Sequence, residues 1–169
     1  MKVLKFGGTS VGSVENIANV KTIINDGEKK VVVLSAMSGT TNQLVAISNH
    51  IANKEFVEAI EKVNKLHDTY VVVIDSLLSH GVLNKEVKTY VSGIFNVLVE
   101  SINKPYSVQL ENEIVAQGEL LSTYMVTSYL NQEGVKASLL PALEFMRIDE
   151  HKDPDLNYIK AHFKSTFDK

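Results

Sequence analysis

Cysteine is absent from this chain of 169 residues, which excludes disulfide bonds, thiolate metal sites and cysteine nucleophiles. An excess of basic charge is also missing. The net charge is -3 and there is no basic stripe, so we expect no nucleic-acid partner. The longest apolar run, Tyr70–Ile74, is far shorter than the roughly 20 residues of a membrane-spanning helix. The first residues are too charged for a signal peptide. We therefore predict a soluble, cytoplasmic protein with no nucleic-acid or membrane partner.

The histidines are scattered along the chain. The five histidines show no ligand spacing, so we predict no metal site built from protein side chains. The length of 169 residues fits one domain, and the 44% of hydrophobic residues is ordinary for a globular protein. Without a basic excess, any anionic ligand must be held by local groups and not by the overall field.

The start of the chain predicts a βαβ unit. Val3–Phe6 is a short apolar strand that ends at two glycines. Ser13 is a candidate helix N-cap, and apolar residues follow it at helical spacing until Gly27. Lys30–Ala36 contains a continuous β-branched run, which is typical of a strand buried on both faces of a parallel sheet.

The rest of the chain predicts mainly helices. In the polar loop Met37–Asn42, Thr40 or Thr41 is the expected N-cap of the next helix. The run Tyr70–Ile74 could form a strand, but the helical spacing around it favours a helix. The expected helices lie around Leu44–Ile51, Phe56–Leu77, Val87–Ile102, Ser107–Leu130 and Asp155–Phe167, and the expected strands at Val135–Leu140 and Phe145–Ile148. These elements predict an α/β fold with a helix-rich insertion and too few strands for a complete doubly wound sheet.

A first candidate site lies where the first strand ends and a helix is about to begin. Glycine lets the backbone approach a phosphate closely, and N–H groups at a helix start point toward an anion. Two hydroxyls and the Lys5 ammonium can add to the stabilisation of a transferred phosphoryl group. The lysine precedes the glycines, unlike in a P-loop, and Thr9 replaces the second glycine of a Rossmann fingerprint. A tight turn beside an exposed lysine is the alternative. The site comprises Lys5, Gly7, Gly8, Thr9 and Ser10.

A second candidate is the loop after the second strand. Ser35 ends that strand, and Ser38, Thr40 and Thr41 carry hydroxyls that suit a small polar ligand. The carboxyl ends of neighbouring parallel strands share one edge of a sheet, and ligands bind at that edge. We therefore expect this loop to lie beside Gly7–Ser10. The alternative is an ordinary capped helix start.

Glu119 is a third candidate, inside a predicted helix. It follows Gly118, and a glycine in a helix costs about 1 kcal/mol relative to alanine, so a close backbone or ligand contact is the expected compensation. Glu119 shares a largely apolar stripe with Val115, Ser122 and Val126, where a carboxylate needs a cation or strong donors. The ammonium of an amino acid would serve. A solvated glutamate at a helix edge is the alternative.

Four segments, in order along nearly the whole chain, resemble the aspartate kinase family. These segments are Lys5–Val11, Leu34–Asn42, Gly118–Ser122 and Phe145–Asp149. The Phe-Gly-Gly-Thr-Ser form of the first segment points to the aspartate branch of the amino acid kinases. In the last segment Arg147 could pair with a ligand carboxylate or in a surface ion pair. The chain departs from the family pattern after Arg147, which leaves a role for Asp149 open.

The resemblance implies a three-layer αβα sandwich of the amino acid kinase type, with a mostly parallel sheet. It implies in-line transfer of the γ-phosphoryl group of ATP to the side-chain carboxylate of L-aspartate. The product is 4-phospho-L-aspartate, the first step toward lysine, threonine and methionine. Mg²⁺ would arrive with ATP, held mainly by phosphates.

The resemblance also implies roles for individual residues. Lys5 would contact the ATP phosphates and stabilise the transition state. Thr41 and Glu119 would bind aspartate, with Glu119 on its ammonium and Ser35 in the same site. The residues lining the phosphate site would be Lys5, Gly7, Gly8, Thr9 and Ser10.

By the same resemblance, residues 1–169 are the N-terminal, aspartate-binding portion of an amino acid kinase domain, incomplete at its C-terminal side. Family members carry a further Arg-Gly-Gly-Ser-Asp segment, a nucleotide-binding half and regulatory ACT domains, none of which this sequence contains. We expect this chain alone to be inactive, and its unfinished sheet edge to favour a homo-oligomer, as a dimer. Two other functions stay open: a kinase for glutamate, carbamate or a nucleoside monophosphate, and a non-catalytic ligand-binding module.

Overall fold

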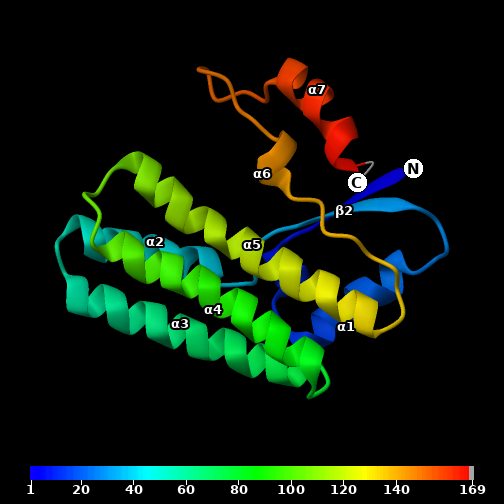
Figure 1. The fold of residues 1–169 in the computed structure, drawn as a ribbon, viewed down its shortest axis with the longest axis horizontal. Coiled ribbons are helices and arrows are strands. Elements are labelled where there is room, and N and C mark those ends of the chain that lie inside the picture. The colour runs from blue at the N-terminus through cyan, green and yellow to red at the C-terminus, as the bar shows by residue number, and fades with distance from the viewer. Residues whose placement is uncertain (168–169) are drawn as a thin grey trace. The chain divides into compact units, whose positions relative to one another are not determined.

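The computed structural model describes residues 1–167, which divide into a larger unit, Met1–Ala137, and a smaller unit that begins at Ser138. The larger unit (Figure 1) contains β1 Lys2–Phe6, the 3-10 helix η1 Gly8–Val11, α1 Val14–Ile24, β2 Lys30–Leu34, α2 Thr40–Ala52, α3 Phe56–Leu77, α4 Val82–Ile102 and α5 Val108–Gln132. The smaller unit contains α6 Ala142–Phe145 and α7 Leu156–Phe167.

The predicted βαβ unit is confirmed. Strands β1 and β2 pair in parallel, with Lys5 opposite Val33 and Phe6 opposite Leu34. The Ser13 hydroxyl accepts a hydrogen bond from the N–H of Asn16 at 3.2 Å, so the predicted N-cap of α1 is confirmed as well. The crossover helix α1 lies on the same side of the strands as α3 (Figure 1).

One face of this sheet is exposed in the described residues. Leu4, Phe6 and Leu34 pack against the core, but Val3 is 65% exposed and Val33 is 45% exposed. The prediction that the second strand is buried on both faces is therefore wrong for this structure. Side chains alternate along a strand, and the helices of the larger unit cover one of the two faces only.

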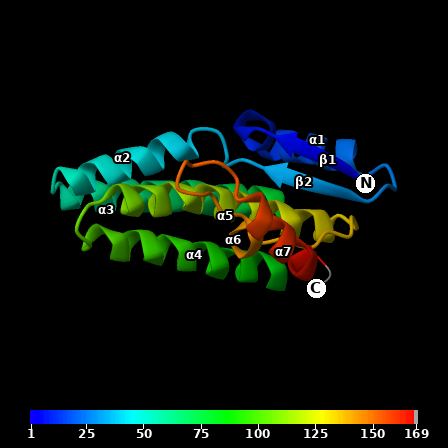
Figure 2. The same cartoon turned by 90° about the horizontal axis from the view of Figure 1, so that it is seen from above.

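Long amphipathic helices form the core of the larger unit. The predicted helices are confirmed, and Tyr70–Ile74 lies within α3. Leu44 of α2, Ile74 of α3 and Leu121 of α5 are fully buried in this common core. Figure 2 shows α2 running onward from the end of β2 beside α3. No helix in residues 1–167 is both long and apolar enough to cross a bilayer.

The start of α2 differs from the prediction. Its N-cap residue is Gly39, in the left-handed region at φ 81°, and no side chain caps this helix. Thr40 is the first helical residue, and its hydroxyl lies 3.0 Å from the Tyr70 hydroxyl. Thr40 or Thr41 as N-cap is therefore wrong, because the glycine turn has taken the capping position.

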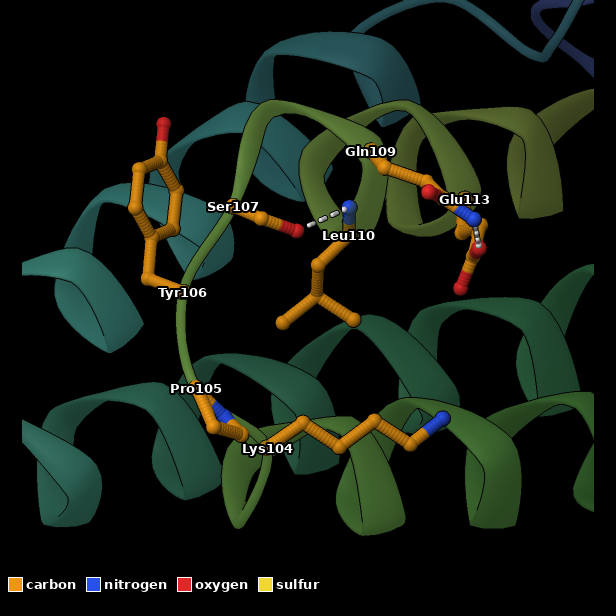
Figure 3. Close-up of a pocket in the computed structure, with 7 residues that line it drawn as sticks. All are labelled: Lys104, Pro105, Tyr106, Ser107, Gln109, Leu110 and Glu113. Carbon is orange, nitrogen blue, oxygen red and sulfur yellow. Dashed lines mark hydrogen bonds between the residues drawn. The ribbon is translucent and has the colours of Figure 1, made fainter.

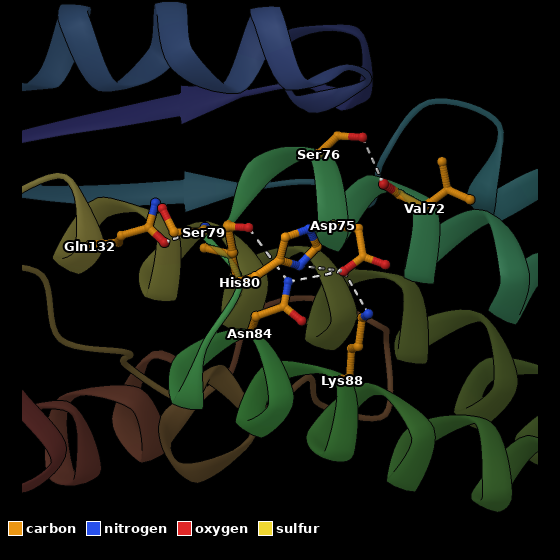
Figure 4. Close-up of polar contacts among 9 residues, drawn as sticks. Val72, Asp75, Ser76, Ser79, His80, Asn84, Lys88 and Gln132 are labelled. Carbon is orange, nitrogen blue, oxygen red and sulfur yellow. Dashed lines mark hydrogen bonds and ion pairs between the residues drawn. The ribbon is translucent and has the colours of Figure 1, made fainter.

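A polar cluster joins α3 and α4 at their connecting turn (Figure 4). The Asp75 carboxylate lies 2.6 Å from the Lys88 ammonium and accepts a hydrogen bond from the amide of Asn84 at 3.1 Å. The N–H of Ser79 donates to the side chain of Gln132, at the end of α5, at 2.7 Å. The hydrogen bonds from Lys88 and Asn84 hold the pKa of Asp75 below its ordinary value.

The predicted strand Val135–Leu140 is wrong, since these residues are irregular. The side chain of Asn131 explains why no strand forms here. Its amide donates to the carbonyl of Ala137 at 2.9 Å and accepts from the N–H of Ala137 at 3.0 Å. A side-chain amide therefore takes the backbone groups that a neighbouring strand would bind.

The smaller unit is held by aromatic contacts and a tight turn. The rings of Phe145 and Phe163 meet edge to face at 5.2 Å. Phe145 ends α6, so the predicted strand Phe145–Ile148 is wrong apart from one bridge between Ile148 and Pro154. The helix predicted at Asp155–Phe167 is confirmed as α7.

Candidate active site

The two predicted ligand loops lie side by side at the carboxyl ends of β1 and β2, as the parallel pairing requires. The N–H of Ser38 donates to the carbonyl of Gly8 at 3.1 Å. A Cβ added at Gly8 would lie 2.9 Å from the carbonyl oxygen of Ala36. Real Cβ atoms do not come that close, so only glycine allows this approach of the two loops. The predicted adjacency is confirmed.

The first loop forms η1 before α1 begins. The N–H of Ser10 donates to the carbonyl of Gly7 at 3.0 Å, and the Asn16 amide donates to the carbonyl of Thr9 at 2.8 Å. The glycines therefore lead into a short 3-10 turn, and α1 starts later with its own cap at Ser13. A Cβ at Gly7 would meet no atom within 4 Å, so the space around this glycine is open.

Lys5 stands at the exposed face of β1, directly before this loop. Its side chain takes part in none of the ion pairs found among residues 1–167. Its positive charge is therefore available to an anion at the end of the strand.

Gly118 brings α5 against the second loop. A Cβ at Gly118 would lie 2.8 Å from Ala36 Cβ, 3.2 Å from Leu44 Cδ1 and 3.3 Å from Thr40 Cγ2. The expected compensation for a glycine inside a helix is thus a close packing contact with the loop after β2 and with α2.

Glu119 reaches the end of β2 from the same helix. Its carboxylate accepts a hydrogen bond from the N–H of Ala36 at 3.3 Å, across 83 residues of sequence. The side chain is otherwise exposed. The predicted apolar setting is wrong, because α5 turns Gly118 and Ser122 inward and leaves Glu119 at the helix edge.

Ser122 and Tyr70 were missed as site residues by the sequence reasoning. The hydroxyl of Ser122, which is fully buried, donates to the carbonyl of Ser35 at 2.9 Å. Ser122 lies three residues after Glu119 on the same stripe of α5, and this helical spacing was the sequence signal that could have identified Ser122. Tyr70 binds Thr40, and burial raises the pKa of its hydroxyl to about 12. Nothing local in the sequence connects residues 40 and 70.

Thr41 and Ser35 take different positions in the second loop. Thr41 lies in the first turn of α2 and is exposed, while Ser35 is half-buried with its carbonyl bound to Ser122. Both residues belong to the segment that follows β2, which also contains Ala36, whose N–H binds the Glu119 carboxylate.

Arg147 and Asp149 belong to the smaller unit. Arg147 lies 4.0 Å from the Asp155 carboxylate in an exposed ion pair, as the surface alternative predicts. Asp149 accepts hydrogen bonds from the N–H groups of His151 and Asp153 at 2.8 and 3.0 Å, so it closes a turn.

A shallow hollow lies elsewhere, at the turn between α4 and α5 (Figure 3). Its polar groups already bind one another: Ser107 accepts from the N–H of Leu110 at 3.1 Å, and Gln109 donates to Glu113 at 2.9 Å. The convergence of chemical groups at the strand ends therefore identifies the candidate site better than this hollow does. Within residues 1–167, no three His, Asp or Glu side chains gather as a metal site would need.

Known proteins are similar to this chain in sequence. The lysine-sensitive aspartokinase 3 of Escherichia coli is 30% identical over 91% of this chain and 34% of its own length. The chloroplastic aspartokinase 2 of Arabidopsis thaliana is 30% identical over 91% of this chain and 29% of its own length. The chain thus spans about a third of the length of these relatives.

Solved structures give the same fold. The crystal structure of E. coli aspartokinase III in complex with aspartate and ADP matches with a TM-score of 0.82 at 27% identity, over 99% of this chain and 37% of that one. The aspartate kinase of Clostridium acetobutylicum, at 19% identity, matches with a TM-score of 0.73. The predicted fold class, an incomplete αβα sandwich, is confirmed. The model of the amino acid kinase family matches residues 1–169, and the chain belongs to that family.

Proposed function

We propose that residues 1–169 are the N-terminal, aspartate-binding portion of an aspartate kinase. The enzyme would transfer the γ-phosphoryl group of ATP to the side-chain carboxylate of L-aspartate, giving 4-phospho-L-aspartate. One observation carries the proposal: the glycine loop, the lysine and Glu119 converge at the carboxyl ends of β1 and β2. The names of the relatives support the substrate, and the solved relative with aspartate and ADP supports both ligands.

The end of β1 would hold the phosphates. Lys5 makes no ion pair within residues 1–167, and its positive charge would stabilise the charge that develops on the transferred phosphoryl group in the transition state. The open space at Gly7 leaves room for phosphate oxygens, and Gly8 keeps both loops together. Thr9 and Ser10 add hydroxyl donors beside them.

The end of β2 and the middle of α5 would hold aspartate. Glu119 would bind its ammonium, since Glu119 is exposed and, within residues 1–167, its carboxylate accepts a hydrogen bond only from the N–H of Ala36, at 3.3 Å. Thr41 and Ser35 would offer hydroxyls to the same substrate. Ser122 would position Ser35 through its hydrogen bond of 2.9 Å.

The chemistry of this transfer needs no general base. The side-chain carboxylate of free aspartate is ionised at neutral pH, because its ordinary pKa is about 3.9. One of its oxygens attacks the γ-phosphorus, a P–O bond forms, and the bond to the β-phosphate oxygen breaks to release ADP. Catalysis is then a matter of positioning and charge stabilisation, which Lys5 and Glu119 can supply.

Several further features stay predictions. Mg²⁺ would arrive with ATP and be held mainly by its phosphates, as is usual for this ion, and we assign no step to it. The nucleotide-binding half would lie outside residues 1–169. The dimer and the cytoplasmic location likewise stay predictions.

A substrate panel tests the proposed function. The full-length protein is incubated with ATP, hydroxylamine and one acceptor: aspartate, glutamate, carbamate or a nucleoside monophosphate. We expect acyl hydroxamate with aspartate, and none from residues 1–169 alone. ADP release with another acceptor in place of aspartate would favour a different amino acid kinase. Ligand binding without any turnover would favour a non-catalytic module.

A further inference from the structure

Tyr70 places a hydroxyl in the otherwise aliphatic buried face of α3. The side chain is 1% exposed, and the other buried residues of the helix are Ala59, Val63, Leu66, Ile74 and Leu77. Phenylalanine would fill nearly the same volume without the cost of burying a hydroxyl, a cost that a hydrogen bond must offset. The partner is the hydroxyl of Thr40, at 3.0 Å.

Thr40 uses both branches of its side chain. Its Oγ1 binds Tyr70 of α3, while its Cγ2 lies 3.3 Å from the position of a Cβ at Gly118 of α5. A β-branched side chain has few χ1 rotamers, so these two contacts select one of them. Thr40 is 3% exposed at the start of α2, and three helices meet at this residue.

Thr40 also stands between two residues assigned to the substrate. Thr41 follows it in sequence, and Glu119 follows its packing neighbour Gly118. The first turn of α2 has no side-chain cap, because its N-cap residue is Gly39. The hydrogen bond to Tyr70 is therefore the side-chain anchor of this turn.

We propose that Tyr70 is a positioning residue for the substrate amino acid, which holds Thr41 and the Gly118–Glu119 segment in place through Thr40. This inference rests on the proposed function. The hydroxyl of Tyr70 stays protonated over the neutral pH range, so the bond is present at any working pH. Tyr70 does not touch the substrate, and its loss should act on the affinity for aspartate more than on the phosphate site.

Steady-state kinetics of the full-length kinase test this proposal. In Tyr70→Phe, we expect KM for aspartate to rise about three- to tenfold, the equivalent of one hydrogen bond, with KM for ATP nearly unchanged. Thr40→Val should give the same result. The double variant should be no worse than either single variant, because both lose the same bond. Thr40→Ser keeps the hydroxyl and should retain most of the affinity.

Tyr124→Phe is the matched control. Tyr124 stacks on Tyr90 of α4 with ring centroids 3.6 Å apart, and the Thr40 hydroxyl binds Tyr70 instead, so removal of the Tyr124 hydroxyl should leave KM for aspartate unchanged. An unchanged KM for aspartate in Tyr70→Phe, or an equal rise for aspartate and ATP, would overturn the proposal.

Amide hydrogen exchange provides a readout without turnover. In the chain of residues 1–169, Tyr70→Phe should speed exchange in the first turn of α2, and Tyr124→Phe should not. Equal protection in the two variants would contradict the positioning role. If the wild-type full-length protein phosphorylates no aspartate, the proposed function fails, while the exchange experiment still decides what Tyr70 does.

Discussion

Replacement of Gly118 by alanine sets helix propensity against tertiary packing. In a helix interior, alanine is more favourable than glycine by about 1 kcal/mol. At Gly118, however, the new methyl group would lie 2.8 Å from Ala36 Cβ and 3.2 Å from Leu44 Cδ1. Overpacking of this kind costs about 1–3 kcal/mol. We expect packing to prevail, so that the free energy of unfolding falls by as much as about 2 kcal/mol.

Gly93 of α4 offers a matched comparison. It is also inside a helix, but a Cβ there would meet no atom within 4 Å. Gly93→Ala should therefore raise the free energy of unfolding by about 0.5–1 kcal/mol. Urea unfolding of the two variants, followed by far-UV circular dichroism, measures the difference. A Gly118→Ala variant as stable as Gly93→Ala would refute the close approach of α5 to α2 and to the loop after β2.

Three further predictions concern the site and the α3–α4 turn. Lys5→Ala in the full-length protein should lower kcat about 10²- to 10³-fold with KM for aspartate little changed; near wild-type turnover would make Lys5 an ordinary strand-end lysine. Gly7→Ala should lower turnover without changing the melting temperature, because the added methyl group meets no protein atom but enters the space that we assign to phosphate oxygens. Gly8→Ala should lower both turnover and the melting temperature, because its methyl group would lie too close to the carbonyl oxygen of Ala36. Equal melting temperatures of the two variants would contradict this. The pKa of Asp75 is depressed in the fold by its hydrogen bonds from Lys88 and an amide. Its stabilisation is therefore present above its unfolded pKa of about 4 and is lost as pH falls through the lower folded value. The stability difference between wild type and Asp75→Asn should shrink in that range, and a difference independent of pH would disprove the linkage.

Much of the fold was predictable because local patterns and tertiary packing agree. The stripe of α3 continues through Val63, Leu66, Tyr70 and Ile74, which are all buried, so the helix keeps one apolar face across the β-branched run although Val72 within that run is exposed. Ser13 capped α1 as its sequence position indicated. The parallel pairing of β1 and β2 followed from the short strand–helix–strand unit.

The wrong predictions arise where different groups compete for the same backbone N–H or carbonyl, and a sequence pattern does not show which group wins. Val135–Leu140 has the composition of a strand, yet the side-chain amide of Asn131 forms hydrogen bonds with both the N–H and the carbonyl of Ala137. The capping position of α2 went to Gly39, whose left-handed φ of 81° suits glycine. Which side chain takes a backbone group depends on geometry a few residues away.

The candidate site likewise has a part that the sequence predicted and a part that it did not. Glycines and hydroxyls after two parallel strands predicted the adjacent loops, because chain topology alone brings strand ends together. The hydrogen bonds that support these loops could not be predicted from the sequence, because Thr40 and Tyr70 are 30 residues apart and Ser35 and Ser122 are 87 residues apart. The exposure of Glu119 depends on the rotation of α5 about its axis, which the mixed stripe of that helix leaves undetermined.

Glu119→Gln in the full-length protein tests most directly whether α5 and the end of β2 bind the substrate amino acid. The change keeps the shape of the side chain and removes its charge. Glu113→Gln, on the same helix, is the control, because Glu113 is exposed and, within residues 1–167, its carboxylate accepts a hydrogen bond only from Gln109 of the same helix. We predict that Glu119→Gln raises KM for aspartate about ten- to hundredfold, the equivalent of a lost charged hydrogen bond, with KM for ATP unchanged. Equal KM values for aspartate in the two variants would contradict an aspartate site at the end of β2.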